Sequence, residues 1–411
     1  MAKLDPRLFH KITKRGVAEI IPEREFVKRL EEGAPLRLKM GFDPSRPDLH
    51  LGHVVGLRKL RQLQELGHRV ILIVGDWTAQ IGDPSGQSDT RTMMTAEQVR
   101  ENAETYMRQF FKVIDKSKTQ AVYQSEWFGK FTLTDVIKLT SYFTVNQFLH
   151  RDDFAKRYAS ERPIAITELL YPLLQGYDSV AIHADVEFGG TDQKFNLLVG
   201  RELQEKMGQR PQQIFTMPIL VGTDGTRKMS KSLGNYIAIE DTPADMFGKV
   251  MSLPDNVIPT YYDLLTDVPD DEVSEIRRSI EGRTVNPMEL KKRLGSYLVS
   301  DFHSREAAQE ARADFERVFQ QREAPAEVPA FSLRPGVDGV ESADAEGATV
   351  DLSKLLVAAG LAPSRAEARR LIGQNAVEVD GARATTAPLR VAYGALVRVG
   401  SRRFARLVRG E

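Results

Sequence analysis

A short run of β-branched residues sets the strongest limit on how this chain can fold. Val70-Ile71-Leu72-Ile73-Val74 is continuously apolar and ends at Gly75-Asp76, as expected for a strand buried on both faces. Another strand is expected at 36–42, and a helix with regularly spaced leucines is expected between the two, at 54–66. Strand, helix and strand in this order predict a parallel α/β sheet with right-handed crossovers. Similar alternation continues to about residue 245, which predicts one α/β domain over 1–245.

Three segments of different character follow this α/β region. Residues 246–322 are mostly helical in pattern and strongly charged, so a helical domain is expected there. Residues 323–350 are interrupted by prolines and glycines and are mainly acidic, which predicts a solvated linker. Residues 351–411 form a small basic module with eleven Lys/Arg and five Asp/Glu, although the whole chain has 57 of each. Any nucleic-acid role must therefore depend on local charge.

Composition excludes several classes of protein. The 411 residues are 41% hydrophobic and 28% charged, which is ordinary for a globular protein of two or three units. The chain has no cysteine, so a disulfide framework, a thiolate zinc site and a thiol nucleophile are excluded. No apolar run approaches the roughly 20 residues of a membrane span. The first residues lack the apolar core of a secretion signal, so a cytoplasmic location is expected.

The tetrapeptide His50-Leu51-Gly52-His53 stands where a strand and a turn lead into a helix. Such a helix start presents free N–H groups and a positive helix end to an anionic ligand. His50 and His53 can each donate a hydrogen bond to phosphate oxygens, and Gly52 lets a nucleotide lie against the backbone. The alternative is that the histidines only cap or pack the helix start. Asp48 is a further candidate for the helix cap. No third ligand lies nearby, so a metal site is not expected.

A second motif, Lys228-Met229-Ser230-Lys231-Ser232, is surrounded by glycines and small polar residues. With Arg227 it places three cations within five positions, which predicts a mobile cationic loop. Such a loop can close on a polyphosphate and neutralise the charge of a leaving pyrophosphate. A solvated basic turn is the alternative. The position of the loop, about 175 residues after the histidine motif, favours phosphate binding.

Tyr171, Gln175 and Asp178 are spaced i, i+4 and i+7 and therefore share one face of a helix. Polar side chains on such a face either meet solvent or line a pocket, because burial without partners is costly. Leucines fill the neighbouring positions, which disfavours a plain surface helix. In Gly189-Gly190-Thr191-Asp192-Gln193 the glycines allow close approach of the backbone, and Asp192 can accept ribose hydroxyls. An ordinary turn is the alternative for this segment.

The basic module contains a candidate RNA-binding helix. Ser364 can cap a helix that carries Arg365, Arg369 and Arg370. Contact with RNA phosphates is the functional interpretation, and a solvated basic face is the alternative. Only two aromatic residues occur in the module, so base stacking has little support.

The two motifs together resemble those of the class I aminoacyl-tRNA synthetases, in which both bind ATP. The chain resembles bacterial tyrosyl-tRNA synthetases most, because further motifs occur in that family's order: GFDPSRPDLHLGH (41–53), IGDPSG (81–86), YPLLQGYD (171–178), GGTDQKFN (189–196) and KMSKS (228–232). The segment 352–381 resembles an S4 RNA-binding domain.

This resemblance implies a Rossmann-like catalytic domain over 1–245 with a dimer-interface insertion at roughly 120–160. It further implies an α-helical anticodon-binding domain at 246–322, the linker at 323–350 and an S4 domain at 351–411. The implied substrates are ATP with Mg²⁺, L-tyrosine and tRNA(Tyr), with no DNA or membrane partner and no tightly bound cofactor. A homodimer is implied, with 143–149 at its interface.

The resemblance also assigns candidate residues. The catalytic candidates are His50, His53, Lys228 and Lys231. The ATP-binding candidates are Gly41, Asp43, Gly52, His53, Gly190, Asp192, Met229, Ser230, Lys231 and Ser232. The tyrosine-binding candidates are Lys39, Asp83, Tyr171, Gln175, Asp178 and Gln193.

Within the tyrosine subsite, the resemblance implies separate roles. Tyr171, Gln175 and Asp83 match residues that hold the α-amino group, Gln193 matches a residue near the carboxyl group, and Asp178 matches the acceptor of the phenol proton.

Lys39 departs from the family pattern, since many members have a tyrosine at this position that contacts the substrate phenol. The cation could hold Asp178 ionised, the phenol could have a single contact or another partner, or Lys39 could point to solvent.

Two other functions remain open from the sequence. Tryptophanyl-tRNA synthetases share both nucleotide motifs and a similar YPxLQxxD helix, but they typically lack an S4 tail. A non-catalytic S4-type RNA-binding protein with a degenerate synthetase body is the second alternative, and the intact motifs argue against it.

Overall fold

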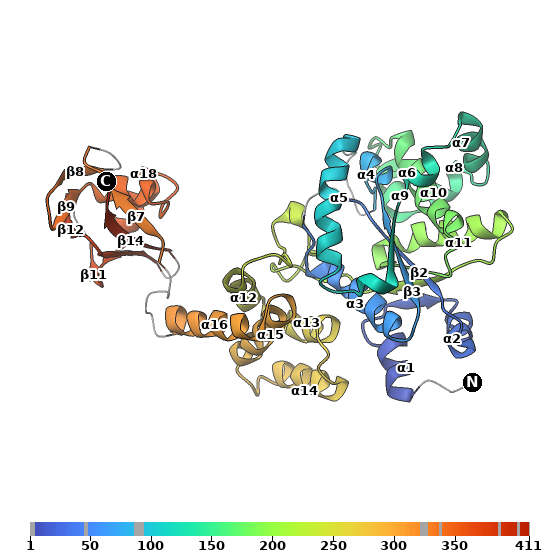
Figure 1. Ribbon diagram of the computed structural model, residues 1–411, viewed down its shortest axis with the longest axis horizontal. Coiled ribbons are helices and arrows are strands. Elements are labelled where there is room, and N and C mark those ends of the chain that lie inside the picture. Colours follow the sequence, from blue (N-terminus) through green and yellow to red (C-terminus); the bar gives the residue numbers. More distant parts are fainter. Residues whose placement is uncertain are drawn as a thin grey trace. The chain divides into compact units, whose positions relative to one another are not determined.

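The computed structural model describes residues 5–44, 48–85, 94–320, 328–336, 339–384, 388–400 and 403–410. The chain forms two compact units, Met1–Arg305 and Glu306–Glu411 (Figure 1). The finer division of the first unit into a catalytic and an anticodon-binding domain stays a prediction.

A six-stranded sheet forms the centre of the first unit, with the order β1-β6-β5-β2-β3-β4. All neighbouring strands are parallel except β1, which runs antiparallel to β6. The strands are β1 (Glu19–Ile21), β2 (Arg37–Phe42), β3 (Arg69–Val74), β4 (Thr119–Tyr123), β5 (Val186–Gly190) and β6 (Gln213–Met217). The parallel α/β fold and the two strands expected at 36–42 and 70–74 are therefore confirmed.

The direction of winding reverses between β5 and β2. The chain passes from β2 to β3 through α3 (Leu51–Glu65), and from β5 to β6, in the opposite direction along the sheet, through α11 (Lys194–Lys206). Right-handed crossovers then place the two helices on opposite faces of the sheet. Ligands of such sheets bind beyond the carboxyl ends of the strands at this switch point.

Helices surround the sheet and continue after it (Figure 1). Before residue 243 these are α1 (Pro6–Thr13), α2 (Glu23–Glu32), α4 (Thr78–Ile81), α5 (Ala96–Phe110), η1 (Lys116–Lys118), α6 (Ser125–Phe128), α7 (Leu133–Thr140), α8 (Val145–Leu149), α9 (Asp152–Ala159), α10 (Ile166–Ala181), η2 (Thr191–Gln193) and η3 (Lys231–Leu233). The later ones are α12 (Pro243–Met251), η4 (Asp255–Val257), α13 (Ile258–Leu265), α14 (Asp270–Glu281), α15 (Pro287–Phe302), α16 (Arg305–Phe315) and η5 (Glu316–Gln320), so the helical pattern read from the sequence is correct.

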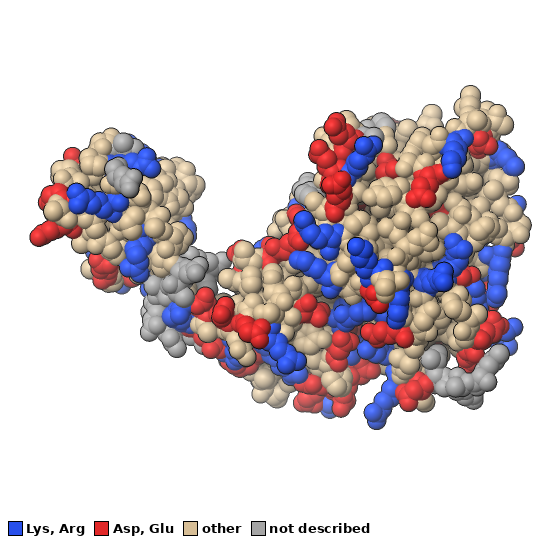
Figure 2. All heavy atoms as spheres, in the orientation of Figure 1, with Lys and Arg blue, Asp and Glu red and all other residues tan. Residues whose placement is uncertain are grey.

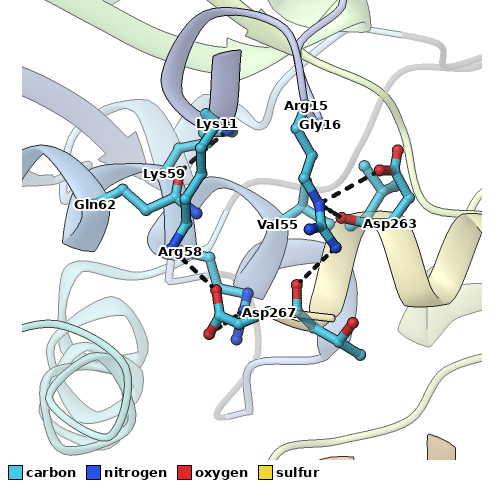
Figure 3. A pocket seen from close by; sticks show the side chains of 11 residues that line it. Lys11, Arg15, Gly16, Val55, Arg58, Lys59, Gln62, Asp263 and Asp267 are labelled. Atoms are coloured by element: carbon cyan, nitrogen blue, oxygen red, sulfur yellow. Dashed lines mark hydrogen bonds and ion pairs between the residues drawn. The ribbon is translucent and has the colours of Figure 1, made fainter. Parts of the chain in front are cut away.

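Charged side chains join α3 to the later helices of the first unit. Figure 3 shows Arg15, Arg58, Asp263 and Asp267 around a small pocket in this region. Arg58 of α3 lies 2.9 Å from Asp267 and 3.3 Å from Asp301. Arg15 donates to the carbonyl oxygens of Tyr262 and Thr266 at the end of α13. Arg58, in the middle of α3, therefore links the helix that starts at the histidine motif to the chain beyond residue 245.

The second unit contains two small sheets, of order β11-β10-β13-β14-β7 and β12-β9-β8. Its strands are β7 (Ala330–Leu333), β8 (Val340–Ala343), β9 (Gly347–Val350), β10 (Val377–Val379), β11 (Ala382–Arg383), β12 (Leu389–Ala392), β13 (Leu396–Val399) and β14 (Arg403–Arg409), and its helices besides α16 are α17 (Leu352–Ala358) and α18 (Arg365–Gly373).

The prediction of a solvated linker over 323–350 is wrong for residues 330–333, 340–343 and 347–350, which form β7, β8 and β9. Leu333, Val340 and Val350 are buried in the hydrophobic core of the second unit. Pro335, Gly336 and Gly339 lie between β7 and β8, and Gly347 begins β9; Gly339 has a φ of +87° that suits a turn. Residues 321–327 lie outside the described part of the chain.

No helix among the described residues is long and apolar enough to cross a membrane. On the visible face of the first unit, Lys and Arg alternate with Asp and Glu (Figure 2), in keeping with equal numbers of the two kinds in the chain.

Candidate active site

A cleft of about 680 Å³ opens at the switch point, beyond the carboxyl ends of β2 and β5. It is lined by the end of β2, the start of α3, one face of α10, the end of β5 and the loop at 228–232. The predicted site residues that line it are Gly41, Asp43, His50, Gly52, His53, Asp83, Tyr171, Gln175, Asp178, Gly190, Asp192, Gln193, Lys228, Met229, Ser230, Lys231 and Ser232. The structure therefore brings both nucleotide motifs and the polar face of α10 into one cavity.

The two histidines both cap α3 and line the cleft. His50 is the N-cap residue, and its Nδ1 accepts the Gly52 N–H at 3.1 Å, while His53 Nδ1 accepts the His50 N–H at 3.2 Å. Because each Nδ1 is an acceptor, each neutral ring carries its proton on Nε2 and can donate from there. Burial lowers the pKa of His53 to about 4, with help from the nearby Lys231 charge, and also holds the pKa of His50 far below its usual range. Both rings are thus neutral donors at pH 7.

Two details at this helix start differ from the expectation. Asp48 does not cap the helix, because His50 does; the Asp48 carboxylate instead lies 3.8 Å from Lys231 Nζ. A Cβ on Gly52 would lie 2.9 Å from the His50 ring. Glycine at this position therefore makes space for the capping ring, in addition to any space it leaves for a ligand.

Backbone hydrogen bonds join the segment that follows the cationic loop to the histidine motif. Leu51 N–H donates to Ile237 O at 3.0 Å, and Ile239 N–H donates to Leu49 O at 3.1 Å. The Asn235 side chain accepts the Ser230 N–H at 2.8 Å and so holds the loop itself. The segment after the second motif thus pairs directly with the first, although about 190 residues separate them.

The two lysines of the loop face acidic groups from different parts of the cleft. Lys228 Nζ lies 3.1 Å from Asp192 Oδ2, beyond the end of β5. Lys231 Nζ lies 3.8 Å from Asp48, and its side chain is only 9% exposed. The oxygens of a polyphosphate in the cleft can replace these carboxylates as partners of the two lysines.

Carboxylates and a tyrosine hydroxyl form the next part of the cleft. Tyr171 Oη donates to Asp43 Oδ2 at 2.9 Å, and Gln193 Nε2 donates to Asp83 Oδ2 at 2.6 Å. Burial and the neighbouring Asp43 raise the pKa of Tyr171, so the phenol stays protonated. This concentration of acceptors suits a ligand ammonium group.

Asp178 lies on the same helix and is almost fully buried. Its carboxylate accepts hydrogen bonds from Gln124 Nε2 at 2.8 Å and from Trp127 Nε1 at 3.2 Å. Burial raises the pKa of Asp178 to about 7, while the Lys39 charge and the two donors act in the opposite direction. Gln124 and Trp127 are not among the residues predicted from sequence. Their only local signal is that polar groups directly follow the end of a parallel strand, β4.

Lys39 does not line the cleft. The prediction that it contacts tyrosine directly is therefore wrong. Its side chain is fully buried and lies 2.8 Å from Glu187, so the alternative of a solvent-exposed side chain is wrong as well. A β-strand directs alternate side chains to opposite faces, and the residue at position 39 points to the face covered by α10, where it bonds to Gln175 O.

The predicted RNA-binding arginines belong to the second unit. Ser364 accepts the Glu367 N–H at 3.2 Å and caps α18, as expected. Arg365, Arg369 and Arg370 are all exposed. Arg365 lies 3.4 Å from Asp351, and Arg370 pairs with Glu367, so part of the positive charge of this helix is balanced locally.

Comparisons with known proteins agree with this geometry. Residues 31–320 match the family model of class I tRNA synthetases (W and Y). Over 397 residues the chain is 55% identical to the tyrosine–tRNA ligase of Dehalococcoides mccartyi (strain CBDB1), covering 97% of this chain and 98% of the relative. The tyrosine–tRNA ligase of Carboxydothermus hydrogenoformans is 50% identical over 406 residues, with 97% of each chain covered. The chain belongs to the tyrosyl-tRNA synthetases of class I.

Other matches extend this assignment. Residues 332–396 match the tyrosine–tRNA ligase SYY-like C-terminal domain, which begins inside the segment expected to be a linker. A crystal structure of the Archaeoglobus fulgidus tyrosyl-tRNA synthetase complexed with L-tyrosine superposes with a TM-score of 0.61 at 25% identity, covering 74% of this chain and 98% of that one. The tryptophanyl alternative is not favoured, since these relatives are all tyrosyl enzymes.

Proposed function

We propose that this chain activates L-tyrosine with ATP, giving tyrosyl-adenylate and pyrophosphate, and then transfers tyrosine to the terminal ribose of tRNA(Tyr). The observation that carries the proposal is the single cleft that holds His50, His53 and both loop lysines at one part and Asp178 at another. Because tRNA and ATP are cytoplasmic substrates, we place the reaction in the cytoplasm.

In the first step a tyrosine carboxylate oxygen attacks the α-phosphorus of ATP, and the bond to pyrophosphate breaks. The step needs no protein nucleophile, so we infer that catalysis consists of positioning and charge stabilisation. His50 and His53 donate Nε2–H to phosphate oxygens, and Lys228 and Lys231 neutralise the leaving pyrophosphate. We expect Mg²⁺ to enter with ATP, since the described residues contain no group of three or more ligands able to hold a metal.

The remaining ATP and tyrosine contacts follow from the lining of the cleft. We assign the ribose to Asp192, with Gly41 and Gly190 admitting the nucleotide to the backbone. We assign the α-amino group of tyrosine to acceptors on Tyr171, Gln175 and Asp83, in support of which all three residues line the cleft. Asp178 accepts the phenol proton, and Gln193 lies toward the carboxyl group.

We assign tRNA binding to the helices after residue 245 and to the second unit, where the exposed Arg365, Arg369 and Arg370 contact phosphates as in an S4 domain. Substituting all three by alanine is expected to weaken tRNA binding and to reduce its salt dependence. The rate of adenylate formation without tRNA is expected to stay unchanged, which separates tRNA binding from catalysis.

We also propose a homodimer. Of the large apolar side chains that are exposed in the described part of the chain, five lie on α7 to α10: Leu133, Ile137, Val145, Tyr158 and Ile166. Exposed apolar groups gathered on neighbouring elements mark interaction surfaces. Ile137→Asp is expected to give a monomer in light scattering, whereas Met288→Asp, at another exposed apolar position, is expected to leave the dimer intact.

ATP–pyrophosphate exchange with each amino acid tests the proposed function. We expect exchange with tyrosine and none with tryptophan. Exchange with tryptophan alone would replace tyrosine by tryptophan as the substrate, and zero exchange with every amino acid would favour a non-catalytic RNA-binding protein.

The role of the loop has its own test. A contact made mainly in the transition state lowers kcat with little change in KM. Lys231→Ala is therefore expected to lower the rate constant for adenylate formation more than the affinity for ATP. A raised ATP KM with unchanged turnover would contradict this role.

A further inference from the structure

Lys39 and Glu187 form a buried ion pair between the two strands that flank the switch point. They are register partners on β2 and β5, and Lys39 Nζ lies 2.8 Å from Glu187 Oε1, with side-chain exposures of 0% and 1%. Neither residue lines the cleft. Removing two charges from water is costly, so a pair placed here is a feature that stability alone does not explain.

The carboxylate of Glu187 accepts from every side. Oε1 accepts from Gln175 Nε2 at 3.2 Å in addition to Lys39, and Oε2 accepts from Ser179 Oγ at 3.1 Å and from Gln212 Nε2 at 2.5 Å. An ionised carboxylate accepts but does not donate. The amide of Gln175 must therefore turn its NH₂ group to Glu187, which leaves its Oε1 for the cleft that Gln175 lines.

The ammonium of Lys39 uses its three donors on fixed partners. Besides Glu187 it donates to Gln175 O and to Ser179 Oγ, each at 2.7 Å. These two groups bracket the turn of α10 that contains Asp178. The Lys39 charge is also one of the influences on the Asp178 carboxylate.

The neighbouring helix leaves space for this network. A Cβ on Gly200 of α11 would lie 2.9 Å from Gln212 Nε2 and 3.2 Å from Glu187 Oε2. Gln212 is itself fully buried and reaches Glu187 across this gap. Gly200 therefore leaves the space in which Gln212 reaches the Glu187 carboxylate.

We propose that Lys39 and Glu187 are positioning residues of the tyrosine subsite. Glu187 presents the amide oxygen of Gln175 to the α-ammonium group of the substrate, and Lys39 holds the Glu187 carboxylate in place. The inference rests on the proposed function, because it requires that the cleft binds an amino acid. Without an acceptor at position 187, the amide of Gln175 is free to turn its NH₂ group toward the ammonium, which repels it.

Two double variants of the full chain test this role by tyrosine-dependent exchange. Lys39→Met/Glu187→Met removes the pair without leaving a lone buried charge and takes away the acceptor for Gln175. We expect it to raise the KM for tyrosine by about 10- to 150-fold, the range of one charge-assisted hydrogen bond, while the KM for ATP stays within about twofold. Lys39→Met/Glu187→Gln keeps a neutral acceptor, so its KM for tyrosine should rise by only about threefold.

A matched control uses another buried ion pair. Arg157 and Glu168 are 3% and 5% exposed and do not line the cleft. Arg157→Met/Glu168→Met should leave the KM for tyrosine within about twofold of the wild-type value, apart from any loss of thermal stability. The tyrosine analogue that lacks the α-amino group, 3-(4-hydroxyphenyl)propanoate, gives a second readout. As an inhibitor it should bind the Lys39/Glu187 variants and the wild type equally.

The outcomes separate the hypotheses. A tyrosine KM that matches that of the control variant would overturn the positioning role. An equal loss of affinity for the deamino analogue or for ATP would overturn it as well. If Lys39→Met/Glu187→Met does not fold, Lys39→Met/Glu187→Gln decides the same question: the tyrosine KM should rise about threefold while inhibition by the deamino analogue stays at the wild-type value, and equal changes for both would overturn the role. Absence of tyrosine-dependent exchange in the wild type would instead overturn the proposed function.

Discussion

Asp178→Asn is the substitution whose effects follow most directly from the geometry of the cleft. The carboxylate accepts from Gln124 Nε2 at 2.8 Å and from Trp127 Nε1 at 3.2 Å, and the proposed phenol is a third donor. An asparagine of nearly the same shape has one acceptor oxygen and one NH₂ group. The new NH₂ group of asparagine then faces at least one of the three donors, which are Gln124 Nε2, Trp127 Nε1 and the phenol, and that donor loses its acceptor.

The substitution is expected to lower both kcat/KM for tyrosine and the free energy of unfolding. A hydrogen bond to a charged acceptor contributes about 1.5–3 kcal/mol, so kcat/KM for tyrosine should fall by about 10- to 150-fold. The donor left without an acceptor lowers the free energy of unfolding by about 1–3 kcal/mol. Phenylalanine has no phenol proton and leaves the wild-type carboxylate unpaired, so its kcat/KM should rise in the variant.

Exchange assays with tyrosine and with phenylalanine, together with thermal unfolding, measure these effects separately. Asp185→Asn is a control, because Asp185 also accepts two hydrogen bonds but does not line the cleft. It should leave the ratio of the two kcat/KM values unchanged. Equal losses for tyrosine and phenylalanine in Asp178→Asn would refute the phenol contact and leave Asp178 with a structural role alone.

Two pH dependences complete the predictions. Since burial raises the pKa of Asp178 to about 7 and the ionised form is the phenol acceptor, tyrosine affinity in equilibrium dialysis should rise about tenfold from pH 6 to pH 8; a profile that stays equally steep in Asp178→Asn would contradict this. Lys59, buried beside Arg15 and Lys11, has its pKa lowered from 10.5 to about 7, chiefly by burial. Between these values the unfolded chain binds one more proton than the folded chain, so the free energy of unfolding rises with pH, by up to on the order of 5 kcal/mol. Lys59→Met should lose this rise in denaturant titrations at pH 7 and pH 10, and an unchanged difference between the two would contradict the assignment.

The parts of the fold that were predictable are those with a local pattern. The β-branched run ending at Val74 and the leucines of α3 identified a strand and a helix directly, since burial on both faces or on one stripe leaves a periodic trace. The strands β7, β8 and β9 were missed because each is only four residues long and because proline and glycine lie between β7 and β8 and glycine begins β9. Their burial depends on partners such as β14, which lies far away in the sequence.

In the site, too, the residues with a local sequence pattern were predictable and the contacts across the sheet were not. The histidine motif, the cationic loop and the polar face with Tyr171, Gln175 and Asp178 could be read from short spacings. The partner of Lys39 could not, because Glu187 becomes its neighbour only through the strand order that places β5 beside β2. Gln124 reaches Asp178 in a similar way, from the end of β4. Contacts across the sheet depend on topology, which the spacing of residues along one strand does not contain.

The central claim is that the histidine motif and the cationic loop act on the triphosphate of one bound ATP. A double-mutant cycle on the single-turnover rate of tyrosyl-adenylate formation tests it most directly, with His53→Asn, Lys231→Ala and the double variant. Because residues that act as a unit are not additive, the double variant should be less impaired than the product of the two single effects by about fivefold or more. Two factors that simply multiply would contradict the account.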